Sequence, residues 1–373
     1  MHNGILLLTL RVFSATGGIE KVCKVLCATF KDIYKGSTSR QFSVFSMYDT
    51  ASDLDCKYIN PENFTGFNEN KISFVKSAIK TGRKSKVVIL SHINLLSIGY
   101  LIKLCSPKTR LVLFAHGIEI WEPLPLLRRI MLRKCDLLLA VSNFTKEKIV
   151  SIHKIPAERV TVVNNCLDPF LPVPVLTGKD ETLLNRYQLK KSDFVLLTLS
   201  RLSSKELYKG YDNVLFALKE LKIKFPNIKY LIIGNYDEEE KQRLDKIIDE
   251  QLLKPNVVFT GFIPDEELAR HYSLADIYVM PSKKEGFGIV FIEAMHYHIP
   301  VIGGNKDGTS DALLNGVLGM QVNPDDKKEL KDAIEKVVIN REKYLPDANL
   351  LEQHFGYPIY RNKIQSVIEN LFA

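Results

Sequence analysis

The sequence predicts an α/β protein with two doubly wound, Rossmann-like domains, each built on a parallel sheet. Short apolar runs alternate with longer segments of helical periodicity through both halves of the chain, as parallel strands and their crossover helices do. The length of 373 residues exceeds what one ordinary core accommodates. A Pro-rich segment at 169–183 interrupts the alternation, so we expect domains at 1–175 and 176–354.

The composition is that of a globular protein with an excess of positive charge. Apolar residues make up 46% of the chain and charged residues 25%, both ordinary proportions. No apolar run approaches the ~20 residues that span a bilayer, and the run near the start is too weakly flanked for a signal peptide. The six scattered cysteines form no CxxC pair, which predicts buried free thiols in a reducing cytoplasm. The net charge of +8 favours an anionic partner without identifying it.

The chain begins with a predicted strand over 4–12, a turn over 14–18 and a helix over 19–34. Strand, glycine turn and helix form the geometry that binds phosphate at a helix N-terminus. Gly17 and Gly18 are therefore candidate ligand-binding residues. The turn has no GxGxxG pattern, which argues against a nicotinamide dinucleotide.

The rest of the first half continues as strand–helix units and leads to a second candidate. His116 follows the apolar run 110–115, and Glu119 lies three residues further on. Functional groups in open α/β sheets gather at the carboxyl ends of strands. His116 and Glu119 therefore lie where a site would form.

The strand–helix pattern resumes after the Pro-rich segment, with strands predicted over 194–200, 229–234, 257–262 and 276–280 and helices over 211–225 and 237–253. The loop after the first of these strands contains Arg201 and Lys209. Two fixed cations near a helix start suit a diphosphate leaving group, whose negative charge grows as the sugar bond breaks. Lys205, in the same loop, is a second candidate for the role given to Lys209.

The stretch 281–300 turns on Gly286 and Gly288 and then begins an apolar helix. Glycine lets the backbone approach a ligand, and a helix start offers free N–H groups. Glu285 precedes the turn, and Glu293 lies eight residues further on, within the helix. Carboxylates on both sides of an anion-binding turn fit a nucleotide sugar, which carries hydroxyls and phosphates. The spacing alone leaves open a surface loop with two solvated glutamates.

The motif EGFGIVFIEAM, followed by PVIGG, resembles glycosyltransferase family 4, the retaining enzymes of GT-B architecture. The resemblance implies that Glu285 meets sugar hydroxyls, that Glu293 binds the nucleotide ribose, and that the backbone of Phe287 and Gly288 binds phosphate. It also implies two domains that face each other across a cleft, the first on the acceptor side and the second binding the nucleotide sugar. A final helix over 355–373 is then expected to pack back on the first domain.

Other segments resemble the same family, in order, over nearly the whole chain. TGGIEKV resembles its first glycine loop, HGIEIW the strand end whose His contacts the transferred sugar, and SRLSSKELYKG its pyrophosphate-binding loop. VVFTGFIPDEEL resembles the segment whose backbone meets the base, and GGNKDGTSDAL the turn that closes the donor pocket. The segment IGNYD lacks the family's second glycine after Gly234, and Cys166 stands where glycine is usual. The resemblance implies the catalytic residues His116, Glu285, Arg201 and Lys209, and the donor-binding residues Gly17, Gly18, Arg201, Lys209, Phe262, Ile263, Glu285, Gly286, Phe287, Gly288, Ile289 and Glu293.

The implied function is transfer of a sugar from a nucleoside diphosphate sugar, GDP-mannose or a UDP-sugar, with retention of configuration. The implied acceptor is a glycan or a polyprenyl-diphosphate-linked saccharide in cell-surface polysaccharide synthesis. Neither a metal nor a cofactor is expected. The D-x-D sequence at Asp53 and Asp55 lies away from every glycine turn. Two alternatives stay open: a non-catalytic nucleotide-sugar-binding or regulatory protein of the same fold, and a basic membrane or nucleic-acid module. Glu285, Glu293 and Arg201 together argue against the first, and no nucleic-acid motif supports the second.

A short basic helix is predicted over 123–134. It combines three arginines with three apolar residues: Arg128, Arg129, Arg133, Leu124, Leu127 and Met131. Such a helix can bind an anionic membrane surface, although most such charge sets form a solvated face. We expect a cytoplasmic protein without a nucleic-acid partner. Peripheral contact with the inner face of the cytoplasmic membrane stays open.

Overall fold

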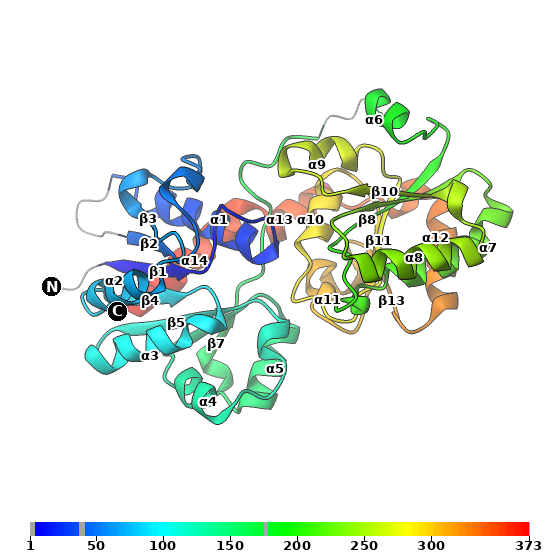
Figure 1. Cartoon of the computed structure of the whole chain (residues 1–373). Helices are drawn as coiled ribbons and strands as arrows, with labels where there is room; N and C mark the ends of the chain where they lie inside the picture. The colour runs from blue at the N-terminus through cyan, green and yellow to red at the C-terminus, as the bar shows by residue number, and fades with distance from the viewer. Residues whose placement is uncertain (1–3, 37–41, 175–177, 373) are drawn as a thin grey trace. The chain divides into compact units, whose positions relative to one another are not determined.

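The structure, a computed structural model, describes residues 4–36, 42–174 and 178–372. The chain forms two units (Figure 1), of which unit 1 contains Met1–Pro169 and Gly356–Ala373 and unit 2 contains Phe170–Phe355. Each unit has its own parallel sheet. The predicted boundary between residues 175 and 176 lies outside the described residues.

The described part of unit 1 contains a seven-stranded parallel sheet in the order β3-β2-β1-β4-β5-β6-β7. The chain builds from β1 to one edge and then crosses to β4 and the other edge, so the order reverses between β1 and β4. The strands are β1 Ile5–Thr9, β2 Phe42–Ser46, β3 Phe64–Gly66, β4 Val87–Leu90, β5 Arg110–Ala115, β6 Leu137–Ala140 and β7 Val160–Val162. The helices are α1 Gly18–Ile33, α2 Lys71–Gly82, α3 Leu96–Cys105, α4 Leu126–Arg133, α5 Asn143–His153 and α14 Tyr357–Phe372.

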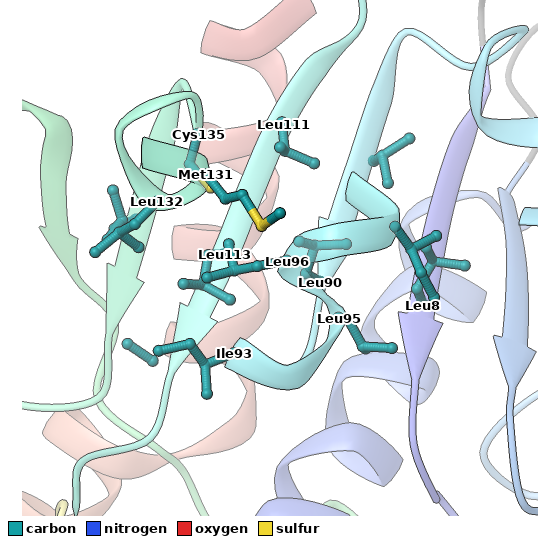
Figure 2. Packing of buried hydrophobic residues seen from close by; sticks show 14 of the residues in the cluster. Leu8, Leu90, Ile93, Leu95, Leu96, Leu111, Leu113, Met131, Leu132 and Cys135 are labelled. Carbon is teal, nitrogen blue, oxygen red and sulfur yellow. The ribbon is translucent and has the colours of Figure 1, made fainter. Parts of the chain in front are cut away.

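Alternate side chains of the unit 1 strands bury opposite faces of the sheet. On one face, Leu8, Leu90 and Leu113 join a buried cluster with residues of α3 and α4 (Figure 2). On the other face, Ile89 and Phe114 line a small space together with residues of α1 and α14. Burial on both faces explains why β4 is entirely apolar, with the sequence VVIL. The C-terminal helix α14 therefore forms part of the core of unit 1.

The described part of unit 2 contains a six-stranded parallel sheet in the order β10-β9-β8-β11-β12-β13. Its order reverses between β8 and β11. The strands are β8 Phe194–Leu199, β9 Ile228–Ile233, β10 Val257–Gly261, β11 Ile277–Met280, β12 Val301–Gly304 and β13 Met320–Val322. The helices are α6 Glu181–Arg186, α7 Tyr211–Lys224, α8 Glu238–Glu250, α9 Asp265–Tyr272, α10 Ile289–His296, α11 Thr309–Ala312, α12 Lys327–Ile339 and α13 Ala348–Phe355. Two parallel α/β units with helices between most successive strands confirm the predicted fold class.

Three local features differ from the sequence prediction. The Pro-rich segment contains the start of α6, where the Asp180 carboxylate accepts a hydrogen bond from the Leu183 N–H at 3.0 Å. Strand β3, at the edge of the unit 1 sheet, has no predicted counterpart because three residues carry too little periodicity. The predicted helix over 355–373 begins too early, since α13 ends at Phe355 and α14 begins at Tyr357.

Candidate functional site

Lys209 and Glu285 meet where the strand order of the unit 2 sheet reverses. Strands β8 and β11 are neighbours in this sheet, and the chain leaves their carboxyl ends in opposite directions, which makes this position the usual ligand site of such folds. The Lys209 ammonium forms an ion pair with the Glu285 carboxylate, and both side chains are mostly buried. Burial alone would lower the pKa of Lys209, but the adjacent Glu285 carboxylate outweighs it and raises the pKa. Lys209 is therefore charged at neutral pH.

Arg201 lies on the same loop as Lys209, after β8. Its guanidinium pairs with Glu206 and is 71% exposed, and Lys205 is also exposed. Gly210 ends the loop with φ 76°, and a Cβ at this position would lie 2.4 Å from the carbonyl oxygen of Pro281. Glycine thus lets this loop approach the loop after β11. The structure places Lys209, not Lys205, beside Glu285.

The glycine turn after β11 leads directly into α10. Gly288 is left-handed, with φ 87°, and no side chain caps the helix, so its first N–H groups have no partner within the helix. The buried ring of Phe287 packs edge-on against Phe355, with 5.4 Å between ring centroids. Gly286 and Ile289, on either side of Phe287 and Gly288 in the chain, are partly exposed. The buried Phe287 side chain therefore fixes the turn, while the backbone of the turn has the geometry of an anion site.

Glu293 lies in the second turn of α10 and is 4% exposed. The Tyr272 hydroxyl donates a hydrogen bond to its Oε2 at 3.3 Å, and the Tyr272 ring stacks on Tyr297 with 5.0 Å between centroids. The open interpretation of two solvated glutamates is wrong, because Glu285 is mostly buried as well. Two inward carboxylates on either side of the turn can accept hydrogen bonds from hydroxyl groups.

Phe262 and Ile263 follow β10, and their backbone is the predicted base contact. Ile263 is buried and Phe262 is 49% exposed. Gly234, at the end of β9, has φ 143°, and a Cβ here would lie 1.9 Å from the carbonyl oxygen of Ser200. The Gly234 N–H donates to the carbonyl of Gly261 at 3.0 Å. Only glycine fits at position 234, because the ends of neighbouring strands approach each other closely there. The absence of the family's second glycine leaves this contact in place.

Gly17 and Gly18 lie at the start of α1 in unit 1. Gly17 is extended, with φ −176°, and no side chain caps the helix. The segment before this turn is held by Asp49, a residue that the sequence analysis missed. Its buried carboxylate accepts hydrogen bonds from the N–H groups of Val12 at 2.6 Å and Ser14 at 2.8 Å. An aspartate at a strand end gives no local sign of bonds to residues so distant in sequence.

His116 follows β5 in unit 1, with its tautomer fixed by a backbone contact. Its Nε2 lies 2.7 Å from the carbonyl oxygen of Ser91. Because a carbonyl only accepts, Nε2 carries the proton and Nδ1 of the neutral ring is an acceptor. Burial lowers the pKa of His116 against the opposing effect of Glu119, so the ring is neutral at pH 7. The Glu119 carboxylate also accepts the backbone N–H of His116 at 2.5 Å, which orients this strand end.

Within residues 4–36, 42–174 and 178–372, no three His, Cys, Asp or Glu side chains are grouped as metal ligands are. Asp53 of the D-x-D sequence accepts hydrogen bonds from the backbone and hydroxyl of Thr50, both at 2.7 Å. All six cysteines are free thiols, and the prediction that they are buried is wrong for Cys56 and Cys105, which are exposed.

An exposed surface on α4, called the α4 surface below, combines apolar and cationic side chains. Leu126, Leu127 and Ile130 are 71%, 62% and 42% exposed, and Arg129 and Arg133 lie one helical turn apart beside them. Unit 1 carries 26 Lys and Arg against 14 Asp and Glu, whereas unit 2 carries 25 against 29. The positive net charge of the chain therefore belongs to unit 1. None of the described helices has both the length and the apolar character needed to cross a bilayer.

The chain contains two parallel-sheet units. In the second unit, Arg201, Lys209 and a glycine turn follow the two strands between which the strand order reverses. These are features of the GT-B architecture. Two family models match this chain. The model described as Glycosyltransferase Family 4 covers residues 56–169, and that described as Glycosyl transferases group 1 covers residues 179–346. Both models describe glycosyltransferases, and together they match most of the chain, in agreement with the family that its motifs predicted.

Similar proteins include a GDP-mannose-dependent alpha-(1-6)-phosphatidylinositol monomannoside mannosyltransferase of Mycobacterium tuberculosis. It is 29% identical over 63% of this chain and 62% of its own length. The capsular polysaccharide biosynthesis glycosyltransferase CapM of Staphylococcus aureus is 28% identical over 62% of this chain and 58% of its own length. The matches thus span about 60% of these relatives.

Solved structures share the fold over nearly the entire chain. The structure of HepE from Anabaena in complex with UDP and glucose has a TM-score of 0.82 at 19% identity, covering 99% of this chain and 100% of that one. A glycosyltransferase from Rickettsia africae has a TM-score of 0.81 at 20% identity, covering 100% of this chain and 99% of that one.

Proposed function

We propose that the protein transfers a sugar from a nucleoside diphosphate sugar to a glycan or lipid-linked saccharide in polysaccharide or glycolipid synthesis. The observation that carries this proposal is the Lys209–Glu285 pair at the reversal point of the unit 2 sheet. A buried cation, an open helix start and the buried Glu293 together offer complementary groups for diphosphate, sugar and ribose. The two family models and the names of the relatives support the same reaction class.

The proposed reaction breaks the bond between the anomeric carbon and the diphosphate oxygen and forms a bond from that carbon to an acceptor hydroxyl oxygen. The acceptor proton moves to the leaving phosphate, with retention of configuration and without a metal. Lys209 and Arg201 stabilise the charge that grows on the diphosphate. Glu285 contacts the sugar hydroxyls, Glu293 the ribose, and Nδ1 of His116 accepts a hydrogen bond from the transferred sugar.

The proposed donor is GDP-mannose or a UDP-sugar. One relative is named as GDP-mannose-dependent, and one structural neighbour was solved with UDP and glucose. The backbone after β10, at Phe262 and Ile263, is the proposed base contact. Backbone groups discriminate between bases less sharply than dedicated side chains would, so the donor is best identified by comparing turnover of several nucleotide sugars.

A donor screen tests the proposed function. The protein is incubated with GDP-mannose, UDP-glucose, UDP-galactose and UDP-N-acetylglucosamine, and nucleoside diphosphate release is measured. We expect turnover of one donor class and its loss in Glu285→Gln. Binding of GDP or UDP without turnover of any sugar, with or without a saccharide acceptor mixture, would instead support the non-catalytic alternative.

We also propose peripheral contact between the α4 surface and an anionic membrane, at the inner face of the cytoplasmic membrane. Exposed apolar side chains can enter the interface while the arginines beside them meet lipid phosphates. The basic excess of unit 1 supports an anionic partner at this unit. A lipid-linked acceptor would make such contact useful, because it brings the acceptor to the enzyme.

Reversing the charge of Arg128, Arg129 and Arg133 to glutamate should lower binding to vesicles containing phosphatidylglycerol by about 100-fold or more, since each cation near such a surface contributes about 1 kcal/mol. Donor hydrolysis should not change. Sedimentation with vesicles measures the effect, which should weaken with added salt.

The matched control for this experiment makes the same change of net charge in unit 2. It reverses three exposed lysines at once: Lys246, Lys254 and Lys328. The control should retain most vesicle binding if the α4 surface makes the contact. Equal binding by the wild type and the arginine variant would exclude the α4 surface, and equal loss in both variants would show that only net charge matters.

A further inference from the structure

We propose that Asp307 is a positioning residue that fixes the Glu285 backbone for catalysis and that protonation of its carboxylate lowers turnover. The inference rests on the proposed function, because it concerns the same donor site. Asp307 lies after β12, within the segment GGNKDGTSDAL that resembles the turn closing the donor pocket, but no role was predicted for this residue itself. Its side chain is 1% exposed, so its bonds are made within the protein.

The carboxylate of Asp307 connects two loops at the carboxyl edge of the unit 2 sheet. One oxygen, Oδ2, accepts the backbone N–H of Glu285 at 2.6 Å, and the other, Oδ1, accepts the N–H of Thr309 at 2.9 Å. The Gly308 N–H returns a bond to the carbonyl of Glu285 at 2.8 Å. Glu285 is thus held at both its N–H and its C=O by consecutive residues of the loop after β12.

Glycines bring these two loops into backbone contact. A Cβ on Gly308 would lie 2.0 Å from the carbonyl oxygen of Gly286, and a Cβ on Gly304 would lie 1.9 Å from that of Ser282. Neither contact leaves room for any other residue. The glycines therefore provide the fit, and Asp307 provides the polar link between the two loops.

The charges around Asp307 make this link sensitive to pH. Burial, reinforced by the nearby Glu285 carboxylate, raises the pKa of Asp307 to about 6. Lys209 neutralises Glu285 from the loop before α7, and Lys306, on the same loop as Asp307, pairs with Asp325 at 2.7 Å. Ionised Asp307 accepts both N–H groups. When the carboxylate is protonated as pH falls through about 6, one of its oxygens becomes a donor facing a backbone N–H, and that bond is lost.

Asp307→Asn tests the proposal because it keeps the size of the side chain but replaces one acceptor with an NH₂ group. We expect kcat at pH 7.5 to fall about 10-fold with the donor that the screen identifies, while the Kd of the corresponding free nucleotide, GDP or UDP, changes less than threefold. The fall in wild-type kcat below pH 6 should be absent from the variant. His116 belongs to unit 1 and is unchanged in both proteins, so the difference between the two profiles isolates Asp307.

Asp326→Asn is the matched control, because Asp326 also accepts two backbone N–H groups, at 3.0 and 2.9 Å, at the start of α12. It should leave kcat and its pH profile unchanged. Amide hydrogen exchange, which needs no turnover, should be faster at Glu285 and Gly286 in Asp307→Asn than in the wild type. If the wild type turns over donor and Asp307→Asn has the same kcat and the same pH profile as the wild type, the inference is overturned. Absence of turnover in the wild type would instead contradict the proposed function, and unchanged exchange would then overturn the positional role by itself.

Discussion

Replacing Lys209 with alanine is expected to lower kcat by about 30- to 1,000-fold, which corresponds to roughly 2–4 kcal/mol of transition-state stabilisation. The ammonium is mostly buried, and the carboxylate beside it keeps it charged. A cation held in this way is already oriented before the diphosphate develops its charge, so little reorganisation is needed during the reaction. Arg201→Ala should have a similar effect, because its guanidinium can form two bonds with a phosphate group.

The two variants should differ in stability. Arg201 is 71% exposed, so its loss should leave the melting temperature unchanged. Removing Lys209 leaves the Glu285 carboxylate mostly buried, unpaired and close to Asp307, and breaking a buried pair on one side is destabilising. Lys209→Ala should therefore melt at a lower temperature than the wild type. Thermal unfolding followed by circular dichroism measures both changes.

Lys205→Ala is the control for these kinetics, because Lys205 lies on the same loop and is exposed. It should retain nearly wild-type kcat and KM with the donor identified in the screen. Severe loss in Lys205→Ala together with near-normal turnover in Lys209→Ala would show that the wrong lysine had been assigned to the diphosphate.

The sequence predicted the fold and most strands because parallel strands buried on both faces are nearly continuous apolar runs. In unit 2 it also located the loops after β8 and β11 that carry Arg201, Lys209 and Glu285. Those residues lie in the loops that follow strand ends, and the carboxyl ends of parallel strands share one edge of a sheet. Local pattern and sheet topology together were therefore sufficient to locate these two loops.

The contacts between loops that the sequence did not reveal are long-range. Asp49 and Asp307 bind backbone N–H groups of other loops, and nothing next to either residue in the chain indicates those partners. The pairing of Lys209 with Glu285 follows only once β8 and β11 are known to be neighbours. The requirement for Gly234 likewise arises from a backbone that approaches in three dimensions. Periodicity identifies elements, but it does not encode which loops touch.

The two glutamates beside the glycine turn should give different kinetic defects. Glu293→Gln should raise KM by about 10- to 100-fold with a smaller change in kcat. A hydrogen bond to a charged group contributes about 1.5–3 kcal/mol, and ribose contacts form before reaction and persist through it, so their loss is a uniform binding defect. Glutamine can still accept the bond from the Tyr272 hydroxyl, so the fold should be retained.

Glu285→Gln should instead lower kcat by about 100-fold or more. Its carboxylate is proposed to meet sugar hydroxyls, whose position matters most as positive charge develops at the anomeric carbon. The substitution also removes the counter-ion of Lys209 in the free protein. Lys209 is then available to the diphosphate without first leaving Glu285, so nucleotide affinity should be equal to that of the wild type or slightly higher.

Calorimetric titration with GDP and UDP separates the two roles without requiring turnover. Glu293→Gln should bind the preferred nucleotide more weakly, whereas Glu285→Gln should bind it at least as well as the wild type does. Wild-type affinity in both variants would contradict the ribose contact of Glu293. Full turnover in both would mean that neither carboxylate serves the reaction, and that the sugar is bound elsewhere in the protein. Loss of nucleotide binding in Glu285→Gln alone would reverse the two assignments, with the ribose then lying beside Lys209.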